Sequence, residues 1–329
     1  MKIRTYSGTN ELRKQPENLV QQDINLFKHE FKKEIQDSYV IEIKNAYLSG
    51  KNLINLKNLR FYIEHTYMNR PPLKNIIKFI LKFFRLRSRS IETIENGVWV
   101  INNKSENYFH WMTESLTRVL SFKKLNLELP ILISEDFKNL EFVTKTLDLL
   151  RINYKIYEND RVFKVKNLLL TSHTAPAGNY NSNILFELHK NLNNGKKSNL
   201  RKRLWVSRKY SDRRYLINED EIKPILDEYN IQVIYPEKMD YLEQVDLFRN
   251  AEFLGGVHGA ALTNMLYMES NSKVLELRAI NDAHNNCHYS LAVGLGNKFY
   301  YLICENDTDS NFIVDPRQFK NTLIEIFKN

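Results

Sequence analysis

Apolar and polar positions follow two periods along the chain, one of two residues and one of about 3.6 residues. Short apolar runs predict strands, and amphipathic stretches between them predict helices. The predicted strands are 39–44, 97–101, 130–134, 154–157, 165–171, 203–207, 232–235, 251–257, 273–277 and 299–303. The predicted helices are 107–122, 139–150, 180–192, 219–229, 241–250, 260–268 and 316–327, and we expect the polar residues 1–36 to be partly helical. This alternation is typical of α/β domains with mainly parallel sheets.

The polar, glycine-containing stretch 191–202 interrupts this alternation and is the best candidate for a linker. A chain of 329 residues is also too long for one small hydrophobic core and indicates about two domains. We therefore predict an α/β protein with two Rossmann-like domains facing each other across a cleft, comprising residues 1–195 and 196–329.

The composition excludes several classes of protein. The chain is 43% apolar and 26% charged, which is typical of globular proteins rather than disordered ones. Two cysteines, Cys287 and Cys304, are too few for a disulfide scaffold and favour a reducing compartment. We see no signal peptide, and no apolar run reaches the roughly 18 residues of a spanning helix. These observations predict a cytoplasmic protein.

The net charge of +9 is concentrated in one stretch. Residues 66–91 contain seven Lys and Arg residues and no acidic residue, and they include a predicted amphipathic helix over 72–89. Apolar residues lie between cations that share one face of this helix, namely Lys74, Lys78, Lys82, Arg85 and Arg89. The pattern favours contact with an anionic membrane surface, the alternative being an ordinary surface helix. Nucleic acid is not expected, because no recognised nucleic-acid motif is present.

The stretch AEFLGGVHGAALTN (251–264) carries the strongest local signal. An apolar strand ends at a turn of small residues and passes directly into a helix, whose free N–H groups suit a phosphate. The candidate phosphate-binding residues are His258, Gly259, Ala260, Thr263 and Asn264. The alternative is a tight strand–helix connection in which the glycines only relieve steric crowding.

Two further features of the second half suit a nucleotide. Arg208 follows a strand and Arg213 lies in the next loop, so both could clamp a diphosphate through paired donors. Glu276 lies near the end of a strand, where a carboxylate could hold the hydroxyls of a ribose. The alternatives are a solvated basic loop and a salt bridge, respectively.

In the first half, His110 and Glu114 are four residues apart on one face of a predicted helix. A histidine beside a carboxylate can act as a general base, although a buried structural histidine is equally compatible with the pattern. Two ligands are too few for a metal. Asp307 and Asp309 form an Asp-x-Asp sequence in a polar loop, but we predict no metal site there.

Taken together, these motifs resemble glycosyltransferase family 61. The resemblance is carried, in order, by NYFHWMTE, SRKYSDRRYLINEDE, MDYLEQVDLF, GGVHGAALTNMLYM and VLEL, and it covers about residues 96–303. It implies a GT-B fold and an inverting, metal-independent transfer of a sugar without a cofactor. The expected donor is a nucleotide-sugar, in particular a UDP-sugar, and the expected acceptor is a glycan or a lipid-linked glycan.

The resemblance also implies roles for the candidate residues. Residues 196–329 would bind the donor, through the candidates named above and Glu276, while residues 1–195 would face the acceptor. Glu114 and His110 would be catalytic, with the choice of base left open, and the acceptor side would include Asn107, Trp111 and His173. With the basic helix, this predicts capsule or surface polysaccharide synthesis on the inner face of the cytoplasmic membrane. A catalytically inactive scaffold of a polysaccharide assembly complex is the alternative.

Overall fold

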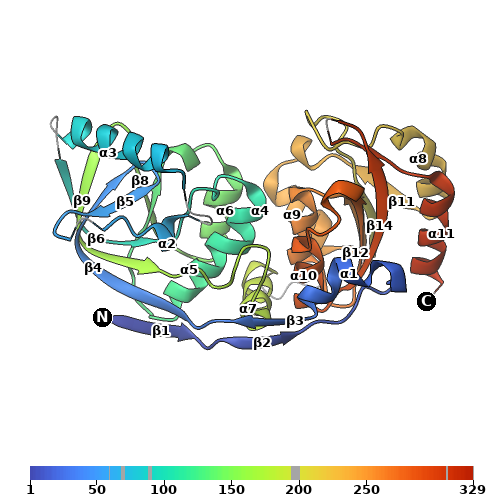
Figure 1. The fold of residues 1–329 in the computed structure, drawn as a ribbon, viewed down its shortest axis with the longest axis horizontal. Coiled ribbons are helices and arrows are strands. Elements are labelled where there is room, and N and C mark those ends of the chain that lie inside the picture. The colour runs from blue at the N-terminus through green and yellow to red at the C-terminus, as the bar shows by residue number, and fades with distance from the viewer. Residues whose placement is uncertain (59, 68–70, 88–90, 194–200, 309, 329) are drawn as a thin grey trace. The chain divides into compact units, whose positions relative to one another are not determined.

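The computed structural model describes residues 1–58, 60–67, 71–87, 91–193, 201–308 and 310–328. The chain forms two compact units, each built around its own sheet (Figure 1). Unit 1 comprises Met1–Thr9 and Ile35–Ala177, and unit 2 comprises Asn10–Glu34 and Gly178–Asn329. Of the helices that the structure describes, none has both the length and the apolar composition needed to cross a membrane.

Unit 1 contains a seven-stranded sheet in the order β1-β4-β9-β6-β7-β8, with β5 also paired to β4. The strands β6 to β9 are mutually parallel where they pair, whereas β4 is antiparallel to β1, β5 and β9. The sheet is thus mixed rather than mainly parallel as expected. The strands are Lys2–Tyr6 (β1), Ser38–Ser49 (β4), Asn52–Asn55 (β5), Ile91–Trp99 (β6), Ile131–Ser134 (β7), Tyr154–Tyr157 (β8) and Val162–Thr171 (β9).

Helix α5 is buried along almost its whole length, whereas α3 and α6 each bury one face. Every residue of β7 is buried, which explains its uninterrupted apolar run. The predicted helix 107–122 is present but is composed of three segments, α4, a π-helical turn and α5. The helical segments are Ile63–Thr66 (α2), Leu73–Arg87 (α3), Tyr108–His110 (α4), Trp111–Ser115 (η3), Leu116–Lys123 (α5), Glu135–Phe137 (η4) and Glu141–Leu149 (α6).

Unit 2 contains a six-stranded sheet in the order β11-β10-β12-β13-β14-β15. All neighbours are parallel except β14 and β15. Gly255 lies against the ring of Trp205, where an added Cβ would come within 2.8 Å of the ring, so glycine is needed for the two strands to pack. The strands are Lys202–Val206 (β10), Ile231–Ile234 (β11), Ala251–Val257 (β12), Lys273–Ala279 (β13), Lys298–Asn306 (β14) and Phe312–Ile313 (β15).

Helices connect the parallel strands of unit 2 (Figure 1). The predicted helix 260–268 is present as the 3₁₀ helix η6. The helical segments are Ser182–Asn193 (α7), Glu219–Glu228 (α8), Pro236–Lys238 (η5), Tyr241–Arg249 (α9), Ala260–Tyr267 (η6), Ile280–Asp282 (η7), Cys287–Gly294 (α10) and Pro316–Phe327 (α11). A capping box formed by Asp240 and Glu243 starts α9, as its sequence allows.

The N-terminal residues form more strand than the sequence indicated. In addition to β1, they form β2 (Thr9–Leu12) and β3 (Lys32–Ile35), which pair with each other, and the short helical segments Gln21–Asp23 (η1), Ile24–Phe27 (α1) and Lys28–Glu30 (η2). Residues 10–34 belong to unit 2 because Phe27 packs against the rings of Tyr289 and Tyr301. The polar composition of this segment gives no indication of the contact between Phe27 and the two tyrosine rings.

The boundary between the units also differs from the predicted one at 195/196. Helix α7 belongs to unit 2, since the Nδ1 atom of His189 donates a hydrogen bond of 2.8 Å to the carbonyl oxygen of Leu266. The polar composition of 191–202 predicts a linker there, but residues 194–200 lie outside the described part of the chain.

Candidate functional site

The sheet of unit 2 places two candidate residues at neighbouring strand ends. Strand β10 lies between β11 and β12. The chain passes from β10 to β11 on one side and then crosses to β12 on the other side of β10. Open α/β sheets bind their ligands at the carboxyl ends of the strands, where the strand order reverses in this way. Arg208 follows β10, and His258 follows β12, whose Gly256 is paired with Val206. Both residues therefore emerge at the expected ligand-binding edge.

The side chain of Arg208 is fixed by its own loop. Its Nε atom donates to the carbonyl oxygen of Arg214 at 2.9 Å, and its Nη2 atom donates to that of Arg213 at 3.2 Å. Its Nη1 atom lies against Gly259, where an added Cβ would come within 2.6 Å of it. Burial, reinforced by the nearby charge of Arg214, lowers the pKa of Arg208 from its ordinary value. A partly desolvated guanidinium of this kind is well suited to an anion.

His258 is held by a buried carboxylate. The Oε1 atom of Glu276, on β13, accepts hydrogen bonds from Nδ1 of His258 at 2.6 Å and from Nδ1 of His288 at 2.9 Å. The guanidinium of Arg278 approaches the other carboxylate oxygen at 3.7 Å. Burial alone would raise the pKa of Glu276, but the two histidines lower it well below its ordinary value. Glu276 is therefore an anion that orients His258.

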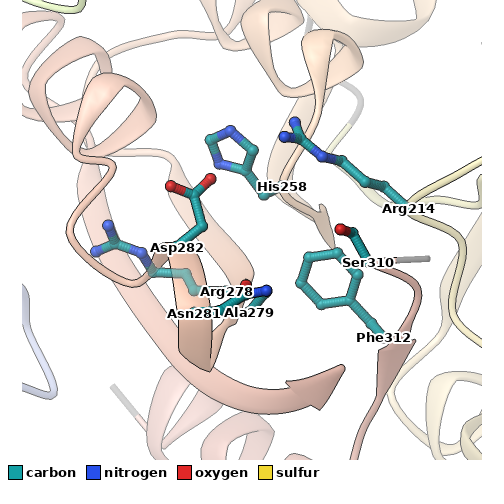
Figure 2. Close-up of a pocket in the computed structure, with 8 residues that line it drawn as sticks. All are labelled: Arg214, His258, Arg278, Ala279, Asn281, Asp282, Ser310 and Phe312. Carbon is teal, nitrogen blue, oxygen red and sulfur yellow. The ribbon is translucent and has the colours of Figure 1, made fainter. Parts of the chain in front are cut away.

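A cavity of about 240 Å³ lies at this edge of the sheet (Figure 2). Its lining comes from four places in the sequence: the loop after β10, the turn after β12, the end of β13 with the turn that follows it, and the segment that leads from β14 into β15. In the view of Figure 2, His258 and Asp282 lie on one side, with Arg214, Ser310 and Phe312 across from them. The lining residues are Arg214, His258, Arg278, Ala279, Asn281, Asp282, Ser310 and Phe312.

Hydrogen bonds hold the walls of this cavity in place. The amide of Asn285 contacts the Nε2 atom of His258 at 3.4 Å and the carboxylate of Asp282 at 3.3 Å. Arg214 and Ser310 both have left-handed backbone conformations, with φ of 58° and 65°. Such conformations are costly outside glycine and occur preferentially at functional sites.

The loop that carries Arg214 is joined to β15 through its backbone. The N–H of Phe312 donates to the carbonyl oxygen of Tyr215 at 2.8 Å, and the N–H of Ile217 donates to that of Phe312 at 2.8 Å. Asn218 bonds the backbone of Val314 with both its amide atoms. Arg214 is thereby fixed relative to the residues of the β14–β15 connection.

The other candidates of unit 2 lie around the cavity rather than in its lining. Gly259 and Ala260 begin η6, whereas Thr263 and Asn264 are buried within it. Arg213 is exposed and contributes its carbonyl oxygen to Arg208. Glu276 is fully buried and bonds histidines, an arrangement closer to the salt-bridge alternative than to a ribose contact.

His258, Cys287 and His288 form a cluster whose potential metal-ligating atoms all lie within 4.8 Å of one another. Burial raises the pKa of the Cys287 thiol, so the thiol keeps its proton. A protonated thiol is a poor metal ligand, because the thiolate is the form that binds metals. The two histidine Nδ1 atoms already contact one oxygen of Glu276 at hydrogen-bond distance. Asp307 of the Asp-x-Asp sequence bonds Asn311 with both carboxylate oxygens, and Asp309 lies outside the described residues. Metal independence stays a prediction.

In unit 1, the predicted pair of His110 and Glu114 is formed. The Nδ1 atom of His110 lies 2.8 Å from Oε1 of Glu114, and the amide of Asn102 donates to Oε2 at 3.0 Å. Glu114 lies in the π-helical turn, a distortion that is common at functional sites. The side chain of His110 is 19% exposed, against 8% for Glu114. The pair can thus pass a proton between solvent-accessible imidazole and a fixed carboxylate.

The three residues expected on the acceptor side have different environments. Asn107 is exposed, and its side chain caps α4 by accepting from the N–H of Phe109 at 3.0 Å. Trp111 is fully buried and donates its indole N–H to Thr146 at 2.9 Å. His173 follows β9, the strand next to β6, and burial together with the charge of Arg118 lowers its pKa to about 3. It is therefore a neutral imidazole.

The comparisons with known proteins identify the family of the chain. The model of glycosyltransferase 61 matches residues 108–275, about half of the chain, which include His110, Glu114, Arg208 and His258. The chain belongs to glycosyltransferase family 61. An 82-residue segment, 24% of this chain, is 34% identical to an EGF domain-specific O-linked N-acetylglucosamine transferase of Drosophila melanogaster. The match spans only 15% of the length of that relative.

Sequence reasoning missed several residues of this family 61 chain. Asn281 and Asp282 line the cavity, and Asn285 contacts His258, yet all three follow β13 in a segment that carries no motif. One signal could have found them. Residues that follow a strand parallel to β12 must emerge at the same edge as His258. Asn102, which bonds Glu114, follows β6 and could have been found by the same rule.

Proposed function

We propose that this protein transfers a sugar from a nucleotide-sugar, in particular a UDP-sugar, to a hydroxyl of a glycan acceptor, with inversion and without a metal. The observation that carries the proposal is the convergence of Arg208, Arg214 and His258 at the strand ends of unit 2, beside a cavity. Membership of glycosyltransferase family 61 supports it. We further propose that the two units are the Rossmann-like domains of a GT-B fold.

On the donor side, the reaction leaves a nucleoside diphosphate with growing negative charge. Hydrogen-bond donors that are fixed before the reaction stabilise such a charge better than mobile ones, because little reorganisation of the protein is needed. The guanidinium of Arg208 is fixed by the carbonyl oxygens of Arg213 and Arg214, and Arg214 lines the cavity. These two arginines would hold the diphosphate.

His258 would supply the third contact. Its Nδ1–H is engaged by the carboxylate of Glu276, so its Nε2 atom, which contacts Asn285 at 3.4 Å, is the one that a ligand can reach. A diphosphate oxygen that displaces Asn285 would contact the ring at Nε2, while Glu276 holds the ring at Nδ1. Expulsion of the leaving diphosphate would then proceed against two arginines and the ring of His258.

On the acceptor side, an inverting transfer is a single displacement in which the acceptor hydroxyl loses a proton. Glu114 and His110 are the groups that we assign to that step. Asn102 fixes one oxygen of Glu114, while the other oxygen is bonded to His110. The proton would leave the hydroxyl for Glu114, or for the pair acting together, and the nucleophilic oxygen would attack the anomeric carbon.

The proposed biological role is synthesis of capsule or surface polysaccharide on a lipid-linked acceptor at the inner face of the cytoplasmic membrane. Membership of glycosyltransferase family 61 and the basic helix α3 support this role.

A panel of nucleotide-sugars tests the proposal through thermal unfolding, because a ligand that binds the native state raises the midpoint. We expect a UDP-sugar to raise it, and we expect the same sugar to be released or transferred on incubation with glycan acceptors. Stabilisation without turnover across a broad set of acceptors would favour the inactive scaffold. No stabilisation by any nucleotide-sugar would contradict the donor site.

A further inference from the structure

Helix α3 has two apolar faces, and only one of them is covered. Phe79, Phe83 and Leu86 are buried in a small cluster that includes Ile54 and Val162. This face anchors the helix to unit 1. Ile76 and Ile80, beside this face, are half-buried.

The second apolar face points to solvent. Its side chains are Leu73, Ile77, Leu81 and Phe84, which are 71%, 48%, 67% and 51% exposed. Their spacing of four, four and three residues places them in one row along the helix. Large apolar side chains exposed singly are common, but a continuous row of them indicates an interaction surface.

A row of cations runs directly beside this apolar row. Lys74, Lys78, Lys82 and Arg85 each follow one of the apolar residues by a single position, and all four are exposed. They therefore lie about 100° around the helix from the apolar row. The helix carries no acidic residue, so nothing on it offsets these charges. Arg87 differs from this row, since its guanidinium lies 5.8 Å from the ring of Tyr47.

We propose that α3 lies in the surface of an anionic lipid bilayer, with Leu73, Ile77, Leu81 and Phe84 inserted among the acyl chains. Lys74, Lys78, Lys82 and Arg85 would contact the headgroups. An apolar row flanked by a row of cations is the arrangement of interfacial helices, in which the two contributions act together. Arg89, which the sequence added to this set, lies outside the described residues.

The charge of α3 favours a bilayer over the other occupants of an exposed apolar row. A second copy of this chain would bring the same four cations against themselves. Nucleic acid would engage the cations but would leave the apolar row in water. A bilayer containing phosphatidylglycerol offers acyl chains to the apolar row and anionic headgroups to the cations.

Sedimentation with vesicles tests the proposal. We expect the full chain to bind vesicles of phosphatidylglycerol and phosphatidylcholine, and to bind pure phosphatidylcholine at least about tenfold more weakly. Two variants should each lower binding to the anionic vesicles by about tenfold or more. One replaces Leu73, Ile77, Leu81 and Phe84 with Gln, and the other replaces Lys74, Lys78, Lys82 and Arg85 with Gln.

A matched control separates a local surface from bulk charge. Lys138, Lys145, Lys155 and Lys223 are exposed residues elsewhere on the chain, and their replacement with Gln removes the same charge. We expect this variant to bind as the unmodified chain does. Equal loss of binding in the control and the α3 variants would overturn the proposal, as would unchanged binding in both α3 variants.

A fluorescent reporter tests insertion without disturbing the charge. Trp99, Trp111 and Trp205 are fully buried and should not respond to lipid. In a Phe84→Trp variant, we expect the new indole to be quenched by brominated acyl chains. A Phe186→Trp variant, at a site 56% exposed on α7, should not be quenched. A shift of Phe84→Trp emission caused by self-association, without lipid quenching, would instead assign the row to a second copy and overturn the proposal.

Discussion

The Nδ1 atom of His258 lies 2.6 Å from the Oε1 atom of Glu276, and the same oxygen accepts a second hydrogen bond from His288. One buried carboxylate thus fixes two imidazoles at the strand ends of unit 2. Only the ring of His258 reaches the lining of the cavity, so His288 serves to hold the carboxylate rather than a ligand.

Glu276→Gln removes the charge from this arrangement and keeps its shape. The amide has one accepting oxygen without a charge, and Arg278 loses its counterion, so we expect the free energy of unfolding to fall by about 3 kcal/mol. Affinity for UDP should fall by about tenfold, because His258 loses a charge-assisted hydrogen bond. Urea unfolding and calorimetry measure the two effects. The exposed Glu269→Gln variant is the control, and a Glu276→Gln protein unchanged in both respects would contradict the network.

Gly259→Ala tests the packing of Arg208 against the turn after β12. The added Cβ would lie 2.6 Å from the Nη1 atom of Arg208, so the guanidinium must move. We expect a loss of UDP affinity of about tenfold with little loss of stability, since the end of a flexible side chain can shift. Calorimetric titration with UDP measures it.

The same substitution in an Arg208→Ala background gives a double-mutant cycle. Once Arg208 is absent, we expect Gly259→Ala to change UDP affinity less than twofold, by the logic of such cycles. Additive losses would mean that Gly259 acts independently of Arg208.

Glu114→Gln should abolish sugar transfer while leaving UDP binding intact. The amide cannot accept the proton of the acceptor, and we expect kcat to fall by about 10²-fold or more. Glu106→Gln is a suitable control, because Glu106 is exposed and its partner is the surface residue Lys51. Turnover retained in Glu114→Gln would exclude this residue as the base and leave His110.

Stability should fall on mild acidification because of the buried histidines of unit 1. Burial, together with the charge of Arg118, lowers the pKa of His65 to about 4 and that of His173 to about 3. Below about pH 6.5 the unfolded chain takes up protons at both residues while the folded chain does not, so acid favours unfolding. Each histidine contributes a slope of at most about 1.4 kcal/mol per pH unit, down to its folded pKa.

Urea unfolding between pH 7 and pH 4 measures this slope. A His65→Gln variant should show a shallower dependence over the same range, whereas the exposed His29→Gln variant should keep that of the unmodified chain. A slope that His65→Gln leaves unchanged would contradict a neutral His65 in the folded state.

The second half of the fold could be predicted closely from sequence. Strand β12 and helix α11 occupy the predicted ranges 251–257 and 316–327, because buried parallel strands are uninterrupted apolar runs and surface helices are periodic. The first half was harder to predict. Strand β4 pairs antiparallel with β9, where Val40 is the partner of Thr171, 131 residues later, and local periodicity carries no record of such pairing.

Candidate residues could be predicted where a residue suited to binding anions comes after a predicted strand. Arg208 and His258 were found because each follows a strand directly. The role of Glu276 depends on His288, which lies in a different helix, and its burial is a property of the assembled sheet. Asp282, which lines the cavity, and Asn285, which contacts His258, lie in a segment without a sequence motif. Their position follows from the strand β13 that precedes them.

The most direct test of the central claim compares UDP with uridine by calorimetry, in the unmodified chain and in Arg208→Ala. Lys209→Ala, which removes an exposed neighbouring charge, is the control. The account predicts that UDP binds the unmodified chain at least about tenfold more tightly than uridine, and that Arg208→Ala removes most of this difference. Equal affinities for UDP and uridine, or a preference for UDP that survives in Arg208→Ala, would contradict a diphosphate site at Arg208 and His258.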